Sequence, residues 1–233
     1  MKIGIITLPF NSNYGGLLQA FALQTVLKQM GHEVWSVNRR NRIMPFKIKV
    51  LSSTNRLLKS IIRGKMGVIR SWATAEEELI IDQHTNRFLS ENIQTTDFLK
   101  SEKEFENLIR YKFDAYVVGS DQVWRPKYSP SLTNHFLGFI NPAHNPKRIS
   151  YAASFGVDNW EYTPEQTAEC RKLVMKFDAV SVREDSAVKL CSENFGIKAT
   201  QVLDPTLLIS REEYIRLVEK DKIPECAGTL LTY

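Results

Sequence analysis

Residues 2–37 read KIGIITLPFNSNYGGLLQAFALQTVLKQMGHEVWSV. The run from Lys2 to Leu8 is apolar and β-branched, which predicts a buried strand. Asn13-Tyr14-Gly15-Gly16 interrupts this run, and apolar residues then recur at helical spacing from Leu17 to Met30, just before a glycine of the kind that ends helices. Glu33 to Val37 predicts a second strand. A strand, a glycine turn, a helix and a strand in this order predict the first unit of a parallel α/β sheet.

The same alternation continues along the chain. Four more strands are predicted, beginning near Phe113, Arg148, Phe177 and Ala199. Helices are predicted over Glu76–Phe88, Glu102–Tyr111, Pro164–Lys176, Glu184–Asn194 and Arg211–Lys220. Four prolines within residues 125–147 predict a long irregular loop, with one short strand at Phe136–Phe139. The sequence therefore predicts an α/β fold in which helices cover both faces of a parallel sheet.

Composition limits the class of protein. Of 233 residues, 43% are hydrophobic and 24% are charged, which is typical of a soluble globular protein and excludes disorder or coiled coil as the main state. No apolar stretch approaches the ~20 residues of a membrane span, and the apolar start is too short for a secretory signal. The three cysteines form no C-x-x-C pair and the four histidines lack zinc-ligand spacing. We therefore expect a cytoplasmic protein without a metal site.

One segment concentrates the positive charge. Ten Lys or Arg residues and no Asp or Glu lie between Val34 and Ala75, and the rest of the chain is net acidic. Apolar residues at helical spacing in Leu57–Ile62 are typical of a short basic amphipathic helix. Two interpretations of this basic insert, at about 39–70, stay open: attraction to an anionic partner such as a membrane surface or a lipid diphosphate, or a solvated excursion packed on the domain. Nucleic acid is not expected as a partner, because no nucleic-acid-binding motif occurs.

Small and polar residues follow every predicted strand. Because the carboxyl ends of parallel strands meet at one edge of a sheet, we expect these residues to line a ligand cleft. Backbone N–H groups at such an edge suit a phosphate or a carboxylate. The candidate site residues are Asn13, Tyr14, Gly15, Gly16, Gly119, Ser120, Asp121, Gln122, Ser154, Gly156 and Arg183.

Single residues of this set also have structural interpretations. Gly15-Gly16 lacks G-x-G-x-x-G spacing, so a dinucleotide site is not indicated and a tight turn is an equal alternative. Asp121 can be a turn or capping residue, and Arg183 can form an ion pair at a helix start. A cation at a helix start opposes the helix dipole, which favours an anionic partner for Arg183. Asp204, which precedes Pro205, is interpreted as a turn residue.

Five motifs occur in a distinctive order. They are NYGGLLQ at 13–19, VGSDQVW at 118–124, SYAASFG at 150–156, SVRED at 181–185 and VLDPT at 202–206. Together they resemble the polysaccharide pyruvyl transferase family over roughly residues 1–210. The resemblance implies the Rossmann-like first half of a two-domain architecture similar to GT-B glycosyltransferases. Residues 1–224 would form this half, and residues 225–233 would be a linker and the start of a second domain.

The resemblance also implies a reaction. Phosphoenolpyruvate would donate a pyruvyl group to two hydroxyls of a sugar, in a cell-surface polysaccharide or its precursor, giving a pyruvyl ketal and phosphate. No cofactor or metal is implied. Asp121 would be the general base, and Arg183 would clamp the donor through its guanidinium. The other candidates, among them Asn13, Gly15 and Ser154, would bind substrate.

Other functions stay open beside this one. The chain is also compatible with a GT-B-type glycosyltransferase that uses a nucleotide sugar, or with a non-catalytic α/β binding module. The expected partner is a sugar or a lipid-linked saccharide, with the basic insert as a contact to the inner face of the membrane. Since the cleft would lie between two domains, we expect residues 1–233 alone not to catalyse pyruvyl transfer.

Overall fold

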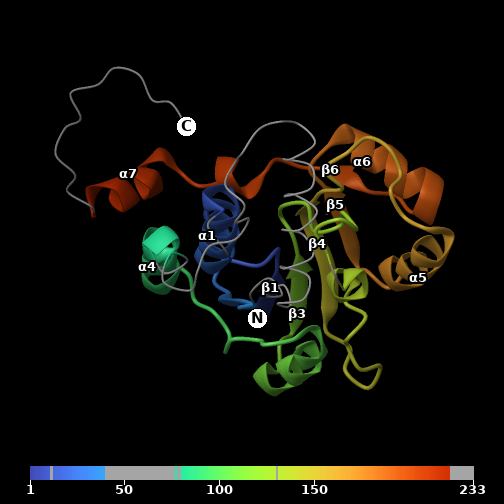
Figure 1. Cartoon of the computed structure of the whole chain (residues 1–233), viewed down its shortest axis with the longest axis horizontal. Coiled ribbons are helices and arrows are strands. Elements are labelled where there is room, and N and C mark those ends of the chain that lie inside the picture. Colours follow the sequence, from blue (N-terminus) through green and yellow to red (C-terminus); the bar gives the residue numbers. More distant parts are fainter. Residues whose placement is uncertain (11–12, 40–76, 78–79, 130, 221–233) are drawn as a thin grey trace, which may run out of the picture.

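The sheet has the parallel topology that the sequence predicts. The computed structural model describes residues 1–10, 13–39, 77, 80–129 and 131–220 (Figure 1). All strand pairs in the sheet are parallel, and the strand order is β2-β1-β3-β4-β5-β6. The strands are β1 Lys2–Ile6, β2 Glu33–Ser36, β3 Ala115–Val118, β4 Lys147–Ala153, β5 Ala179–Val182 and β6 Thr200–Gln201. The predicted Rossmann-like α/β fold is confirmed.

The strand order reverses direction at β1. This strand pairs with β2 on one side and with β3 on the other, so that Ile5 lies opposite both Ser36 and Val117. The connections leaving β1 and β3 therefore run to opposite sides and open a crevice between their carboxyl ends. Open parallel sheets bind their ligands at such a reversal.

Helices and helical turns surround the sheet. The α-helices are α1 Tyr14–Gln29, α4 Gln83–Asn92, α5 Pro164–Val174, α6 Asp185–Leu190 and α7 Arg211–Glu219. The shorter or tighter elements are the 3₁₀ helices η1 Glu102–Tyr111, η2 Leu132–Phe136 and η4 Pro205–Leu207, and the π-helical turn η3 Cys191–Phe195. The local sequence explains why α5 begins where it does: Thr163 and Gln166 form a capping box, and Pro164 is the first residue of the helix.

Alternate residues of the central strands supply two cores. Ile5 and Val117 pack with Leu23 of α1 on one face of the sheet. Ile6 and Val118 belong to a larger core on the other face, which η1, η2, α5 and α6 cover. Figure 1 shows α1 and α5 on opposite sides of the strands. Because successive side chains of a strand point to opposite faces, this arrangement buries the apolar side chains on both faces of the sheet.

Some predicted elements differ in the structure. The strand predicted at Phe136–Phe139 is wrong: Phe136 ends η2, and Leu137 has a left-handed backbone with a φ of 59°. The fully buried Phe136 stacks on Trp124, so this apolar segment serves the core through a helical turn rather than a strand ladder. The segment Glu102–Tyr111 is helical as predicted, but as a 3₁₀ helix.

The predicted basic insert falls almost entirely outside the described residues, as do residues 225–233. Its first residue, Arg39, does not face solvent or a partner, contrary to the expectation for the basic residues of the insert. Arg39 is 3% exposed and donates to Glu102 over 2.7 Å, so its charge is neutralised within the fold rather than presented to a partner. None of the helices in the described part of the chain has the length and apolar character needed to cross a bilayer.

Candidate functional site

A shallow polar pocket lies at the carboxyl edge of the sheet, where the strand order reverses. Its volume is about 570 Å³. Residues from α1, from the loop after β3, from the end of β5, from η4 and from α7 line it: Asn13, Gly15, Gly16, Leu18, Gln19, Asp121, Gln122, Arg183, Asp204, Thr206 and Tyr214. Segments far apart in sequence thus converge, as expected from the topology.

A second cavity, of about 400 Å³, lies near the amino ends of β3 and β4. Phe113, Tyr116 and Phe139 supply aromatic walls there, and its charged groups, such as Lys112 and Glu106, form no shared network. The polar pocket is the better candidate site, since several ionisable groups converge in it and it occupies the ligand-binding edge.

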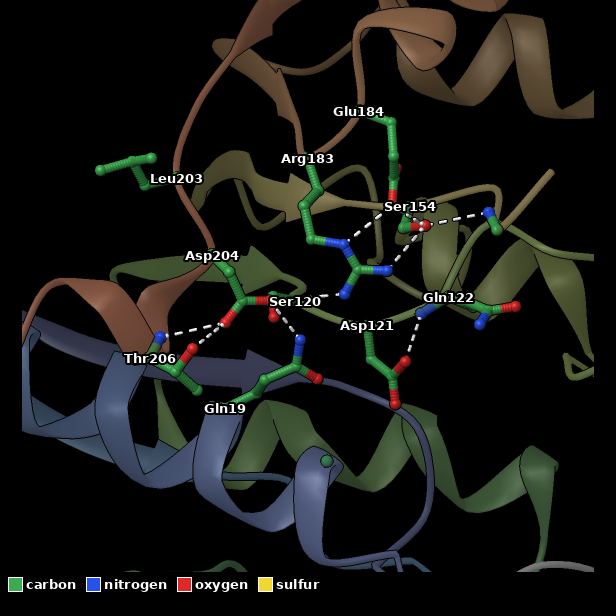
Figure 2. A network of polar contacts seen from close by, with 12 residues as sticks. Gln19, Ser120, Asp121, Gln122, Ser154, Arg183, Glu184, Leu203, Asp204 and Thr206 are labelled. Carbon is green, nitrogen blue, oxygen red and sulfur yellow. Dashed lines mark hydrogen bonds and ion pairs between the residues drawn. The ribbon is translucent and has the colours of Figure 1, made fainter. Parts of the chain in front are cut away.

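Arg183 is the hub of the pocket (Figure 2). It follows β5, and its Nε donates to Glu184 over 2.8 Å. Its Nη1 lies 3.4 Å from Asp204 Oδ2, and its Nη2 donates to Ser154 Oγ over 3.3 Å. Burial would lower the pKa of Arg183, but the hydrogen bond and negative charge of Glu184, with those of Asp204, raise it. The guanidinium is therefore a fixed cation held by two carboxylates.

Asp204 accepts four hydrogen bonds. Its Oδ1 accepts from the backbone N–H and the hydroxyl of Thr206, over 3.0 and 2.7 Å, and its Oδ2 accepts from Gln19 and Arg183. Burial would raise the pKa of Asp204, but the hydrogen bonds of Thr206 and Gln19 and the charge of Arg183 together lower it. Since an ionised carboxylate has about four acceptor positions, Asp204 is saturated within the protein.

Asp121 has the opposite character. It follows β3 with a φ of 79°, and its side chain accepts one hydrogen bond, from the backbone N–H of Gln122 over 2.8 Å. Burial raises the pKa of Asp121, and the charges of Asp204 and Glu184 act in the same direction. Together they outweigh the Gln122 hydrogen bond and the charge of Arg183, which lower it. Asp121 therefore combines free acceptor capacity with a raised proton affinity, the properties of a general base.

The structure brings six predicted site residues to the pocket wall: Asn13, Gly15, Gly16, Asp121, Gln122 and Arg183. Asn13 has a local role as well, since its Oδ1 caps α1 by accepting from Gly16 N–H over 3.3 Å. Tyr14, by contrast, is 63% exposed and does not line the pocket.

The other four predicted residues, Gly119, Ser120, Ser154 and Gly156, do not line the pocket. Ser154 is fully buried, and its hydroxyl accepts from Gly156 N–H and Arg183 and donates to Glu184. Ser120 is 1% exposed, and its hydroxyl has no partner among the described residues. Gly119 has a φ of 131°, and a Cβ there would lie 2.0 Å from the Tyr151 carbonyl oxygen. These residues belong to the backbone and side-chain contacts that position Asp121 and Arg183, and they do not form the pocket surface.

Sequence reasoning missed part of the wall. Asp204 does form a turn, as predicted, because it caps η4, but it also joins the ion-pair network. Gln19 could have been found from the sequence, because it is a polar residue in an otherwise apolar stretch of α1. In the structure its side chain is 8% exposed. No sequence pattern pointed to Tyr214 of α7. Its hydroxyl donates to the Thr206 carbonyl over 2.6 Å.

The net charge of the network is negative. Asp121, Glu184 and Asp204 supply three carboxyl groups, against the one guanidinium of Arg183. Among the described residues no cluster of three His, Cys, Asp or Glu side chains has a geometry suited to a metal ion. Carboxylates held near an arginine can accept hydrogen bonds from a ligand and can take up protons from it.

Comparison with known proteins gives the family. A family model described as polysaccharide pyruvyl transferase matches residues 13–227, a range that contains the whole lining of the pocket. No curated protein matches the chain. The family match covers most of the sequence and confirms the resemblance carried by the five ordered motifs. This chain belongs to the polysaccharide pyruvyl transferase family.

Proposed function

We propose that the protein transfers a pyruvyl group from phosphoenolpyruvate to two hydroxyls of a sugar, in a cell-surface polysaccharide or its precursor, and forms a pyruvyl ketal. The family indicates a polysaccharide pyruvyl transferase in general. The donor and the ketal product are the finer parts of the proposal. The observation that carries it is Asp121, a carboxylate with unused acceptor capacity and a raised pKa at the pocket wall.

The charge of the wall favours the sugar acceptor as its ligand. Phosphoenolpyruvate carries a carboxylate and a phosphate, and the carboxyl groups of Asp121 and Asp204 on the wall, with Glu184 bonded to Arg183, would repel both. Sugar hydroxyls are neutral donors that a carboxylate accepts well. We therefore place the acceptor against Asp121. The donor would enter from the open side of the pocket.

Arg183 then has a smaller part in donor binding than the sequence suggested. Three of its five N–H groups already donate, to Glu184, Asp204 and Ser154. Two N–H groups remain for a substrate oxygen. Because its charge is shared with two carboxylates, Arg183 contacts substrate as an oriented donor more than as an unpaired cation.

The proposed chemistry assigns the first proton transfer to Asp121. Its carboxylate takes the proton of one acceptor hydroxyl, and that oxygen bonds to the central carbon of phosphoenolpyruvate while the methylene carbon takes up a proton from solvent and becomes a methyl group. The C–O bond to phosphate then breaks as the second hydroxyl bonds to the same carbon, the proton of that hydroxyl leaves with the phosphate, and Asp121 returns its proton to solvent. Positioning both hydroxyls for successive attack is a large part of such catalysis.

The test is phosphate release from phosphoenolpyruvate by the native chain, with a panel of saccharides that carry two neighbouring free hydroxyls. The ketal methyl group is identified in the product by NMR. Asp121→Asn should reduce the rate by about 10²–10⁴-fold, the usual contribution of a general base. Asp97→Asn, a change at an exposed aspartate paired with Arg110, should keep the wild-type rate. Sugar transfer from a nucleotide sugar, with no phosphate release from phosphoenolpyruvate, would contradict the proposal.

A further inference from the structure

Arg183 and Asp121 share the pocket without forming an ion pair. Among the ion pairs of the described residues, Arg183 bonds to Glu184 and Asp204, and Asp121 is in none. An arginine near a carboxylate normally closes on it, because the bidentate pair is strong. Something in the pocket therefore keeps the guanidinium turned away from Asp121. Figure 2 shows Arg183 directed toward Glu184, Ser154 and Asp204.

We propose that Asp204 is a positioning residue that holds the Arg183 guanidinium back from Asp121 and so leaves the Asp121 carboxylate free to receive a proton. This assignment rests on the proposed function, in which Asp121 is the base. Asp204 itself touches no reacting atom. Its four acceptor positions are occupied by Thr206, Gln19 and Arg183.

Asp204 is built as a rigid anchor. Tyrosine hydroxyls hold the carbonyl groups on both sides of it: Tyr151 of β4 donates to Leu203 over 3.2 Å, and Tyr214 of α7 donates to Thr206 over 2.6 Å. Gln19 of α1 donates directly to its carboxylate. Contacts from β4, α7 and α1 therefore hold Asp204 and its neighbouring backbone in place. If Arg183 rotates, Asp204 does not move with it.

Replacement of Asp204 by Asn would keep the shape of the side chain and remove its charge. Glu184 would then be the remaining carboxylate partner of Arg183, and Asp121 would be an unpaired carboxylate on the same pocket wall. If the guanidinium turns to Asp121, the new ion pair occupies its free acceptor positions and lowers its pKa. A weaker and blocked base would follow from a change at a residue that does not itself take the proton.

The direct test reads the Asp121 carboxyl group by NMR and needs no activity. Aspartate carboxyl carbons are labelled with ¹³C, the Asp121 signal is assigned with Asp121→Asn, and its titration is followed in wild type, Asp204→Asn, Arg183→Gln and the double variant. We expect Asp204→Asn to lower the pKa of Asp121 in the presence of Arg183, and to lower it much less in the Arg183→Gln background. Equal effects in both backgrounds would mean that Asp204 acts through its own charge, which would overturn the proposal.

Arg183→Gln alone keeps the proposal testable if Asp204→Asn does not fold. The charge of Arg183 lowers the pKa of Asp121 without a direct ion pair, so its loss should raise that pKa modestly, and by less than the loss of a paired arginine would. A steep rise, as for a carboxylate that loses a paired arginine, would contradict the proposal. Asp97→Asn serves as the control for an unrelated loss of charge and should leave the Asp121 signal unchanged.

The kinetic test uses the native chain and the acceptor found for the proposed function. Asp204→Asn should lower kcat about tenfold or more and move the acidic limb of the pH–rate profile to lower pH, with KM for the acceptor little changed. A rise in KM alone would place Asp204 in substrate binding and would overturn a positioning role. Failure of the proposed function would appear separately, as absence of turnover in wild type. The NMR titration would still test whether Asp204 holds Arg183 away from Asp121.

Discussion

Asp121 lies against the first turn of α1: its Oδ2 atom is 3.4 Å from the position that a Cβ atom would occupy at Gly16. The N-terminal end of α1 carries the positive end of the helix dipole, which favours a negative charge nearby. The missing side chain at position 16 lets the carboxylate approach this end and stay open to the pocket. The glycine turn of the first motif thus serves the candidate base as well as the chain reversal.

A side chain at position 16 should therefore impair the site more than the fold. Alanine is a better helix former than glycine by about 1 kcal/mol, so Gly16→Ala should unfold at the same or a higher temperature than wild type. Its rate should fall by up to ~10²-fold, since the added methyl group would lie in contact with Asp121 Oδ2 and keep a substrate hydroxyl from its productive position. Gly15→Ala is the matched variant, because its Cβ meets Asn13 at 3.4 Å instead of Asp121. An equal loss of rate in both variants would contradict the role given to Gly16.

Gly119 should tolerate no side chain. It combines a φ of 131° with a Cβ position only 2.0 Å from the Tyr151 carbonyl oxygen, so Gly119→Ala is expected to lower the free energy of unfolding by about 3 kcal/mol or more. Gly31 is the control, since it has a φ of 84° and nothing within 4 Å of its Cβ position. Gly31→Ala should cost about 1–2 kcal/mol, the price of the left-handed backbone alone. Urea denaturation of both variants measures the difference, and equal losses would rule out the clash.

The buried His135 predicts a fall in stability at acidic pH. Burial, and then the positive charge of Arg39, hold the pKa of His135 well below its usual value, and Arg39 Nη2 lies 2.5 Å from its Nε2. The folded state therefore keeps His135 neutral, whereas the unfolded chain binds a proton near pH 6.5. Stability is present above that pH and is lost below it, by up to ~1.4 kcal/mol per pH unit.

Denaturation of wild type and His135→Gln at several pH values between 5 and 8 isolates this contribution. The variant should lose less stability than wild type as the pH falls below ~6.5. His144→Gln is the control, because the His144 side chain is exposed. Identical pH dependence in wild type and His135→Gln would show that His135 is not the group responsible.

Asp121 and Asp204 should have opposite effects on stability. The folded pKa of Asp121 is raised, so its ionisation opposes folding, and stability falls as the pH rises through its titration. The folded pKa of Asp204 is lowered, so its ionised form supports folding, and this support is lost only as the pH falls through its titration. At pH 7 we expect Asp121→Asn to be at least as stable as wild type and Asp204→Asn to be less stable. The reverse order in urea denaturation would contradict both assignments.

Much of the fold could be predicted, because its signals are local. The apolar runs at β1 and β3 are buried on both faces, and such strands are continuous in sequence. The helix at 164–174 begins where Thr163 and Pro164 predict it to begin. The prediction at Phe136–Phe139 was wrong because a short apolar run has no period of its own, and contact with Trp124 decided its conformation.

The candidate site was predictable in outline and not in detail. The rule that parallel strands end at one edge was enough to select six wall residues from three loops, including Asp121 and Arg183. The same rule also selected Ser154, which the structure buries completely. Position after a strand determines the edge on which a residue lies, but the depth of its side chain depends on the elements packed above it.

The sequence by itself determined the strand and helix order, the parallel sheet and the family, because each depends on patterns and motifs that are contiguous in the chain. Only the tertiary structure decided how the two aspartates of the pocket differ. Asp204 and Asp121 both follow strands and both precede a turn, yet one carboxylate accepts four hydrogen bonds and the other accepts one. The donors to Asp204 come from α1, β5 and η4, which are brought together by folding. Proton affinity depends on such neighbours and on burial, and neither is written in the local sequence.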